Sequence, residues 1–558
     1  NIRSSEEFKL IKLKLRVPIR NGDLDLIKIY LSETIKDDSE TFKYKIDETN
    51  RTASLYDIQY GIEEVTIPRT VKHKSNEYLI TSISGVCSTL RTLKFVEDSA
   101  VDTIYGNTFP CLSPIYEIYF PASLKKLKKG WCDCVTYLND LIISPLNGQF
   151  IMKDDELLLG KSDENSDEFD IVLFAYRSTS KISIPSNIKF ISPYAFNDSY
   201  CLNEIEFQPN SNLQIIGTCA FWLSKIKEIS IPASVTKICE AAFSGCTNLK
   251  KIEIPPNSKL QTIECGAFSN TEISEIYFPP NLKELKEGWC NGAKKLARNI
   301  VSPLNGQFIM KDDKFLLGKS DENNDEFDKI VFAPRYEREI SIPPNIKIIS
   351  SYAFYNFEHL VNVKIPADSN LQTIESYAFA YSSIYEFVIP PKLSKICDHA
   401  LASCPNLKKV VIPENSDLQI IGPSAFLKSK IKEIFIPSKV SIICEDAFGS
   451  CEQLANVIFP PNSNLQIIES GGFINTAIEE IVLPSTVSKI CSSAFQKCSK
   501  LKKVEFPENS NLQSIGSHAF IYSPINELHL PASLKELKEG WCSGTSCLDK
   551  ITISPKNG

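Results

Sequence analysis

Small and apolar residues recur along most of the chain at a regular spacing, and an Ala-Phe pair that follows an Ile is the clearest landmark. Successive copies of the Phe position are alternately 25 and 22 residues apart, so the repeating unit is a 47-residue pair of coils. Such a period predicts a solenoid in which each coil buries its apolar face against the next. The Phe position is occupied by Phe196, Phe221, Phe243, Phe268, Cys290, Phe354, Phe379, Leu401, Phe426, Phe448, Phe473, Phe495, Phe520 and Cys542.

A single short coil, residues 234–256, reads SVTKICEAAFSGCTNLKKIEIPP. Its Leu-x-x-Ile-x-Ile segment at 249–254 alternates with period two, which predicts a short strand. Pro255 ends the strand because proline cannot donate to the next hydrogen-bond ladder. We expect residues 240–243 to form a helical turn that carries Phe243 inward. The predicted fold class is therefore an α/β repeat with one short parallel strand in each coil of 22–25 residues.

The complete coil pattern, Ile-Pro-x-x-Val-x-x-Ile-x-x-x-Ala-Phe-x-x-Cys-x-x-Leu, resembles the BspA-like subfamily of leucine-rich repeats. This subfamily, which includes the Treponema pallidum type, occurs in bacteria and in parasitic protists such as trichomonads. The resemblance covers about residues 41–558. It implies an arched solenoid on a cell surface, where family members are viewed as adhesins for host tissue, matrix proteins or other microbes.

The repeat register breaks twice, because 64 residues separate Cys132 from Phe196 and again Cys290 from Phe354. Near-identical inserts, both beginning SPLNGQFIMKDD, fill these breaks and predict a β-hairpin in each. A further strand is predicted at 8–17. The predicted organisation is a β-rich N-terminal cap at 1–63, repeat coils at 64–132, 181–290 and 339–542, island insertions at 133–180 and 291–338, and the start of a third island at 543–558.

The nonamer LKELKEGWC occurs at residues 282–290 and 534–542, and the related LKKLKKGWC occurs at 124–132. Three of the four Trp residues lie in this phrase, which invites interpretation as a catalytic or metal site. Aligned with an ordinary coil, however, Trp289 falls on the Ala of the Ala-Phe pair. We interpret the phrase as the coil from which the chain leaves for an island, with Trp289 packed at the junction and Gly288 giving it room.

Composition narrows the classes of partner. The net charge is −7 with both signs well mixed, whereas nucleic-acid binding needs a concentrated basic face. No apolar run approaches the roughly 18 residues of a membrane span. The sequence lacks an initiator Met and a signal peptide, which predicts a fragment excised from a longer protein.

Motifs for catalysis are missing from the sequence. The five His residues are scattered, and neither a G-x-S-x-G motif nor a phosphate-binding loop occurs. We therefore predict no enzyme activity, no cofactor and no small-molecule substrate.

Each island carries an Asp-x-Asn-x-Asp segment that resembles the first half of a calcium-binding loop. The sixth position should be Gly but is Glu168 or Glu326, and the twelfth should be Glu but is Phe174 or Phe332. A solvated acidic loop is therefore favoured over a calcium site. The candidate ligands are Asp163, Asn165, Asp167, Asp321, Asn323 and Asp325.

Cysteine recurs in pairs seven residues apart within short coils. A disulfide within a pair would require the helical turn to end early, because seven helical residues span roughly 10 Å. A metal site is disfavoured since no His recurs in register and C-x-x-C spacing is absent. We favour reduced, buried thiols, with disulfides as the alternative. The pairs are Cys239/Cys246, Cys397/Cys404, Cys444/Cys451 and Cys491/Cys498.

The second variable position of the Leu-x-x-Ile-x-Ile strand alternates in charge from coil to coil, except at Asn456. Neighbouring parallel strands would place these side chains about 4.8 Å apart, which predicts a structural ladder of opposite charges. We call these positions the charge row. Its charged members are Glu228, Lys251, Glu275, Glu386, Lys409, Glu433, Glu480, Lys503 and Glu527.

The third variable position is apolar in five successive coils and polar on either side, at Lys364 and Glu505. An exposed apolar patch with a polar rim is typical of a binding surface, although β-branched residues also simply suit strands. We predict partner binding here, with Phe435 as the central anchor and Tyr385 nearby. This outer stripe, as it is named below, consists of Val388, Val411, Phe435, Ile458 and Val482.

Two functions remain open. The favoured one is a non-enzymatic cell-surface binding protein, an adhesin that recognises host-cell, matrix or microbial proteins through the concave face of the repeats, as the resemblance implies. The alternative is an intracellular interaction scaffold of the same fold. Asn50 and Asn197 begin Asn-x-Ser/Thr triplets, which would be glycosylation sites only in a secreted protein.

Overall fold

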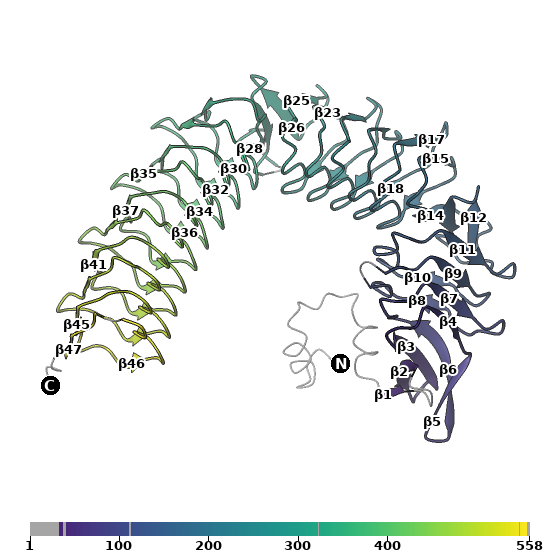
Figure 1. Cartoon of the computed structure of the whole chain (residues 1–558). Coiled ribbons are helices and arrows are strands. Elements are labelled where there is room, and N and C mark those ends of the chain that lie inside the picture. Colours follow the sequence, from purple (N-terminus) through teal and green to yellow (C-terminus); the bar gives the residue numbers. More distant parts are fainter. Residues whose placement is uncertain (1–32, 37–40, 111–112, 322, 546, 555–558) are drawn as a thin grey trace. The chain divides into compact units, whose positions relative to one another are not determined.

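The computed structural model describes residues 33–36, 41–110, 113–321, 323–545 and 547–554. The chain divides into two compact units, Asn1–Ile226 and Lys227–Gly558. Two predictions lie outside the described residues: the strand at 8–17 and the last four residues of the third island. Within the described ranges, every regular element is a β-strand (Figure 1).

The predicted helical turn is wrong, and the α/β class is wrong with it. The segment before Phe243 forms non-helical turns instead. Ala241 has a φ of 53°, and a residue in the left-handed region interrupts a right-handed helix. Phe243 is nevertheless fully buried, as predicted. The coil is thus a β-structure that carries its Phe inward on a turn.

In the first unit, a sheet of order β1-β2-β3-β6-β8-β10 begins with antiparallel strands and continues with parallel ones from β3, with β5 antiparallel to β6. A second, parallel sheet has the order β11-β9-β7-β4. The bounds are β1 (Glu33–Lys36), β2 (Phe42–Asp47), β3 (Thr52–Ile58), β4 (Glu64–Ile67), β5 (Thr70–His73), β6 (Asn76–Ile83), β7 (Thr92–Phe95), β8 (Thr103–Ile104), β9 (Glu117–Phe120), β10 (Lys126–Leu127) and β11 (Asp140–Ile143).

The first insert forms three antiparallel strands, whose last member pairs in parallel with the following coil. Asp154 and Asp155, with φ of 54° and 53°, make the turn between the first two strands. The bounds are β12 (Phe150–Lys153), β13 (Leu157–Gly160) and β14 (Ile171–Ala175), followed by β15 (Lys181–Ile184), β16 (Phe190–Ile191), β17 (Glu204–Phe207) and β18 (Ile215–Ile216).

The second unit begins with coils whose strands pair in parallel, and then repeats the three-stranded insert. The bounds are β19 (Glu228–Ser230), β20 (Lys237–Ile238), β21 (Lys251–Glu253), β22 (Thr262–Ile263), β23 (Glu275–Phe278), β24 (Glu284–Leu285), β25 (Arg298–Val301), β26 (Phe308–Lys311), β27 (Phe315–Gly318) and β28 (Lys329–Phe332).

Each later coil contributes two strands rather than the one predicted: a three- or four-residue strand and a two-residue strand. The longer ones are β29 (Glu339–Ser341), β31 (Asn362–Lys364), β33 (Glu386–Val388), β35 (Lys409–Val411), β37 (Glu433–Phe435), β39 (Asn456–Ile458), β41 (Glu480–Val482), β43 (Lys503–Glu505), β45 (Glu527–Leu530) and β47 (Lys550–Ile553). The shorter ones are β30 (Ile348–Ile349), β32 (Thr373–Ile374), β34 (Lys395–Ile396), β36 (Ile420–Ile421), β38 (Ile442–Ile443), β40 (Ile467–Ile468), β42 (Lys489–Ile490), β44 (Ser514–Ile515) and β46 (Glu536–Leu537).

The two strand sets lie on opposite sides of the second unit. The short strands form one continuous 12-stranded sheet with β26–β28, whereas the longer ones from β29 onward split into sheets of four, two and four. Continuous pairing holds neighbours about 4.8 Å apart, so the interrupted side has the wider spacing. Figure 1 accordingly shows β35, β37, β41 and β45 along the outer side of this unit's bend and β30, β32, β34 and β36 along the inner side. The Leu-x-x-Ile-x-Ile strands were therefore wrongly placed on the concave face.

The core of the second unit contains a column of stacked Phe rings, contributed by most of its coils. Phe448 is fully buried and stacks on Phe426 and Phe473, with ring centroids 5.4 and 5.3 Å away. Leu401 takes the Phe position in one coil and is equally buried. Beside the column, the Cys451 thiol donates to the Phe426 carbonyl oxygen at 3.1 Å. Coil-to-coil stacking of this kind fixes which side chains of each strand face solvent.

Candidate functional site

Two parallel rows of side chains lie on the outer strands of the second unit. Residues two apart on a strand share a face, so Glu433 and Phe435 point the same way on β37. Strand pairing sets Glu433 opposite Asn456 and Phe435 opposite Ile458. The charge row and the outer stripe therefore run side by side across the coils, about 7 Å apart.

Where neighbouring strands are hydrogen-bonded, the members of the charge row lie opposite one another, as predicted. Glu386 lies opposite Lys409, Glu480 lies opposite Lys503, and Glu228 lies opposite Lys251. Some ion pairs of this row follow the register and others do not.

Lys409 does bind the Glu opposite it, with its Nζ 2.7 Å from Glu386 Oε1. Lys251 and Lys503 instead bind Glu253 and Glu505 on their own strands. The hydrogen bond from Lys409 to Glu386 raises the pKa of that lysine. Ion pairs of the charge row therefore join neighbouring coils at some positions only.

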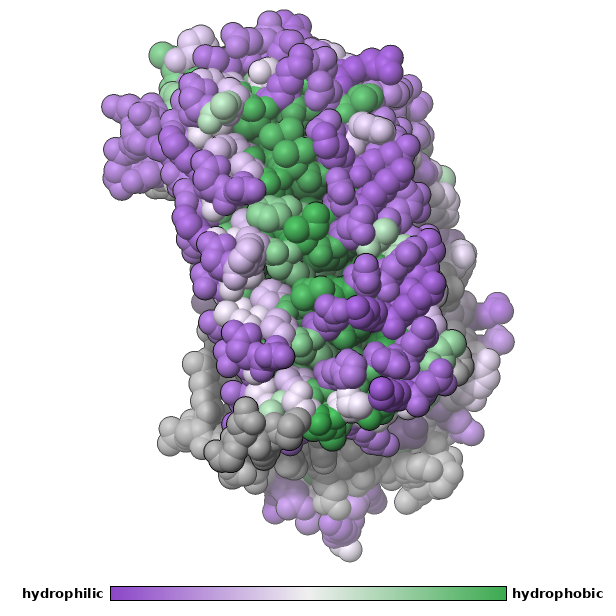
Figure 2. All heavy atoms as spheres, turned by 90° about the vertical axis from the view of Figure 1, so that its left-hand side faces the viewer, coloured by the Kyte–Doolittle hydropathy of each residue, from purple (hydrophilic) through white to green (hydrophobic). Residues whose placement is uncertain are grey.

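The outer stripe is exposed at both ends and half-buried in its middle. Exposed fractions are 42% for Val388, 50% for Ile458 and 56% for Val482. Phe435, predicted as the anchor, is half-buried because its ring packs against the core. Figure 2 shows a hydrophobic band with hydrophilic margins on this side of the molecule. The accessible contact surface is thus centred on Ile458 and Val482 more than on Phe435.

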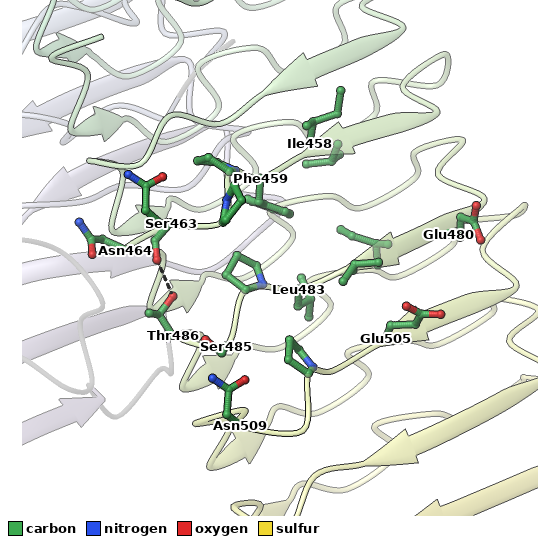
Figure 3. Close-up of a pocket in the computed structure, with 18 of the residues that line it drawn as sticks. Ile458, Phe459, Ser463, Asn464, Glu480, Leu483, Ser485, Thr486, Glu505 and Asn509 are labelled. Atoms are coloured by element: carbon green, nitrogen blue, oxygen red, sulfur yellow. Dashed lines mark hydrogen bonds between the residues drawn. The ribbon is translucent and has the colours of Figure 1, made fainter. Parts of the chain in front are cut away.

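A groove of about 1030 Å³ lies where strand pairing stops between β39 and β41. Ile458, Val482 and Leu483 line its apolar part, together with several prolines. Figure 3 shows Glu480 and Glu505 at one end of the groove and Asn464 and Asn509 at the other. The Thr486 hydroxyl, which also lines this groove, lies within hydrogen-bond distance of two backbone carbonyl oxygens of the preceding coil, Leu465 O at 2.7 Å and Ser463 O at 3.1 Å.

A second hollow, of about 710 Å³, lies where β35, β37 and β39 begin. Its lining includes Ala455, Asn456 and Ala477 together with four lysines, Lys408, Lys409, Lys432 and Lys500. Exposed Tyr385 stands at its edge with Lys408 Nζ 5.3 Å from the ring centroid. The stripe is thus bordered by a hollow on each side.

Sequence reasoning missed a second apolar row on the inner side of the bend. Ile420, Ile442 and Ile467 occupy paired positions in β36, β38 and β40, and Ile420 is 43% exposed. Lys395 and Lys489 take the same register position at the two ends of this inner stripe. The sequence did hold a signal for this row, because each of these short strands is an Ile-Ile pair whose first Ile points to solvent. The prediction of only one strand in each coil overlooked it.

The Gly-Trp-Cys phrase is structural. Trp289 is 2% exposed and packs against Phe332 of the insert strand β28, with centroids 5.9 Å apart, which confirms its predicted place at the junction. Gly288 has a different role from the one predicted. A Cβ atom on it would lie 3.0 Å from the Tyr352 ring, so this glycine makes room for Tyr352.

A buried arginine that the sequence analysis did not single out holds the first junction. Arg177 is 1% exposed, and burial lowers its pKa to about 10. It donates to Ala195 O at 2.6 Å and to Asn197 Oδ1 at 2.5 Å. Asn197, a predicted glycosylation candidate, is thus 1% exposed with its amide engaged, whereas Asn50 is exposed. The sequon at Asn197 is therefore inaccessible in the folded chain.

The acidic island loops form turns through their own side chains. Asp163 Oδ1 accepts from the Asn165 backbone N–H, and Asp321 Oδ1 accepts likewise from Asn323, both at 2.9 Å. Asp325 lies 3.5 Å from Lys319 Nζ. Among the residues that the structure describes, no group of three or more His, Cys, Asp or Glu side chains is arranged to hold a metal ion.

No disulfide joins the cysteines in the described part of the chain, and the first cysteine of each predicted pair is only half-buried. Their reduced state stays a prediction. Cys246, Cys404, Cys451 and Cys498 are fully buried. Burial raises the pKa of Cys404 and Cys498 to about 11 and that of Cys451 to about 12. These thiols act as small apolar groups with one hydrogen bond rather than as nucleophiles.

A family model described as "BspA type Leucine rich repeat region (6 copies)" matches residues 168–297, 325–452 and 419–549. The chain belongs to the BspA-type leucine-rich-repeat family. Leucine-rich-repeat proteins are typically protein-interaction modules, and they are typically not enzymes. In the ranges described above, no helix has the length and apolar character needed to cross a membrane.

Several solved structures are similar to this chain. The pneumococcal vaccine antigen PcpA is 19% identical, with 83% of this chain and 94% of that one covered and a TM-score of 0.43. A leucine-rich-repeat protein from Bacteroides ovatus is 19% identical over 92% and 98%, with a TM-score of 0.36. A leucine-rich cell surface protein from Faecalibacterium prausnitzii is 17% identical over 85% and 94%, with a TM-score of 0.37. No curated protein matches the chain.

Proposed function

We propose that this chain is a non-enzymatic protein-binding module of a cell-surface protein, an adhesin that holds its partner on the outer stripe. The supporting observation is the exposure of apolar side chains at Val388, Ile458 and Val482 in a register position that is polar elsewhere. Exposed apolar patches with polar rims are typical of protein-binding surfaces. Family membership supports protein as the class of ligand.

The outer stripe is favoured over the inner stripe for two reasons. It extends over five coils instead of three, and Ile442 and Ile467 of the inner stripe are half-buried. The outer stripe also borders the groove beside Val482, which can receive a partner side chain. Contacts made in such a hollow exclude water more completely than contacts on a flat face.

The partner class proposed is a host-cell surface, extracellular-matrix or microbial protein, with the chain located outside the cell. An intracellular scaffold with the same binding face is the second candidate. Antibody labelling of intact, unpermeabilised cells that express the full-length protein separates the two. Surface staining supports the adhesin, and staining only after permeabilisation supports the scaffold.

In this proposal the N-terminal segment and the two inserts stabilise the solenoid and do not contact the partner. We assign a capping role to residues 1–63, because strands β1–β3 open the first sheet and repeat arrays need a polar cover on their terminal coil. The inserts at 133–180 and 291–338 would each seal a junction, where the chain buries Arg177 and the corresponding Arg335.

The binding test compares the same substitution on the two sides of adjacent coils. Glu occupies the outer stripe's register position naturally at Glu253 and Glu505, so Ile458→Glu with Val482→Glu should fold. Glu284 and Glu536 occupy the inner position, so Ile442→Glu is the matched control. Full-length chain is titrated onto immobilised matrix proteins and epithelial cells.

The outer double variant should lose at least about tenfold in affinity, because burying each apolar side chain contributes roughly 1.5–3 kcal/mol. The inner variant should bind as the parent does. Loss of binding only in the inner variant would move the site to the concave side.

A further inference from the structure

The hollow where β35, β37 and β39 begin is predominantly basic. Four lysines and two glutamates make up its charged lining. Ala455 and Ala477 line it with short side chains, and the exposed Tyr385 ring stands at its edge. The hollow therefore carries an excess of positive charge beside the outer stripe. Its charged residues are Lys408, Lys409, Lys432, Lys500, Glu433 and Glu452.

Ion pairs neutralise only part of this charge. Within the part of the chain that the structure describes, Lys408, Lys432 and Glu433 form no ion pair. Lys408 instead lies over an uncharged ring, with its Nζ 5.3 Å from the Tyr385 centroid. Two unpaired lysines against one unpaired glutamate leave the hollow with one net positive charge. The other three residues pair with side chains outside the hollow: Lys409 with Glu386 at 2.7 Å, Lys500 with Glu479 at 3.9 Å, and Glu452 with Lys430 at 3.8 Å.

The two unpaired lysines lie side by side in neighbouring coils. The Lys432 backbone N–H donates to Lys408 O at 3.3 Å, which places both residues at the same position just before their strands. Both side chains are exposed. Like charges that face each other across neighbouring strands are destabilising. An anionic group bound between the two ammonium groups would relieve this repulsion.

The outer stripe continues from the same coils. Val411 lies three residues beyond Lys408, and three residues of an extended strand span about 10 Å. Phe435 lies at the same spacing beyond Lys432. A protein segment can supply both an acidic and an apolar side chain, whereas a sulfated polysaccharide has no apolar side chain for the stripe. The single net positive charge likewise suits one carboxylate better than a polyanion.

We propose that the protein partner places an Asp or Glu side chain in this hollow, with its carboxylate between Lys408 and Lys432. An apolar side chain about 10 Å away, as at positions i and i+3 of an extended segment, binds the outer stripe. This inference rests on the proposed function of the outer stripe and adds the chemistry of its ligand. Charge complementarity of this kind selects partners and steers their approach.

The test uses a phage-displayed random dodecapeptide library panned on the full chain, followed by fluorescence anisotropy with the enriched peptides and with heparin. The Lys408→Glu, Lys432→Glu double variant reverses the charge of the hollow. It should fold, because Glu479 holds the same position naturally, where its carbonyl oxygen accepts from the next coil. The Ile458→Glu, Val482→Glu double variant tests the stripe itself.

The Lys227→Glu, Lys250→Glu double variant is the matched control. These two lysines hold the same position in an earlier pair of coils, because Lys250 N–H donates to Lys227 O at 2.9 Å. Their strands continue with the polar Ser230 and Glu253 in place of the apolar stripe. The control therefore makes the same change of charge away from the proposed site.

Enriched peptides should share an Asp or Glu three residues from an apolar residue. They should lose about tenfold in affinity for the Lys408→Glu, Lys432→Glu variant and bind the control variant as they bind the parent. Their binding should weaken as salt is added.

Two results would overturn this inference and leave the proposed function standing. In the first, peptides need Ile458 and Val482 but lack an acidic residue and tolerate the reversed charges at Lys408 and Lys432. In the second, heparin binds through these two lysines while the peptides that need the stripe do not. If no enriched peptide depends on Ile458 and Val482, both the inference and the proposed function are wrong.

Discussion

Replacing one Phe of the central column should loosen a limited set of coils. Phe448 is fully buried and stacks on a ring at each side, at 5.4 and 5.3 Å. Phe→Ala changes in cores cost about 3–5 kcal/mol, of which the two ring pairs represent roughly 0.5–1.5 kcal/mol each. Each coil contacts only its neighbours, so the loss should be confined to the coils that contain Phe426, Phe448 and Phe473.

Native-state hydrogen exchange read by mass spectrometry measures this directly. The reporting amides join successive coils: Phe448 N–H donates to Gly472 O at 2.9 Å, and Ser450 N–H donates to Ile474 O at 2.7 Å. A loss of 3–5 kcal/mol raises their exchange by about 10²- to 10³-fold or more. Phe448→Leu is the control, because Leu401 already fills this position in one coil.

Two results would refute the reasoning. Equal acceleration across residues 339–542 would mean that the second unit opens as one cooperative body and not coil by coil. Unchanged exchange at Phe448 and Ser450 would mean that the column contributes little to coil stacking.

Three further predictions concern thiols, sequons and calcium. Because burial raises the pKa of Cys451 to about 12, the folded state keeps a proton that the unfolded chain loses above about pH 8.5. Stability should therefore fall as pH rises from about 8.5 toward 12, and urea unfolding of Cys451→Ala should show a smaller fall. Secretion from a glycosylating cell should modify Asn50 but not Asn197, as peptide mapping would reveal; a glycan on Asn197 would contradict its burial. Millimolar calcium should leave the melting temperature unchanged, and a shift abolished by Asp163→Ala would show that the acidic loop binds the ion.

The repeat and its buried positions could be predicted because buried sites accept few residue types. Phe243 and Cys246 recur at fixed spacing, and both are fully buried. The second strand of each coil could not be predicted, since Lys237–Ile238 is too short to show a period-two signal. The left-handed turn at Ala241 was equally invisible, because alanine carries no preference for positive φ.

The placement of the candidate surface depended on relations between coils. Which side of the bend a strand occupies follows from whether hydrogen bonding continues across many coils, and no single coil encodes that. The ion pairs show the same limit: Lys251 can reach either Glu228 or Glu253, and the structure pairs it with Glu253.

Hydroxyl-radical footprinting tests the central claim most directly. It compares the full chain alone with the full chain bound to whichever of the tested matrix proteins it binds most tightly. The account predicts protection of Val388, Ile458 and Val482 on the outer side, with oxidation of Ile420 and Ile442 on the inner side unchanged. Protection of Ile420 and Ile442 with no change at Ile458 and Val482 would contradict it, because the partner would then bind the concave side.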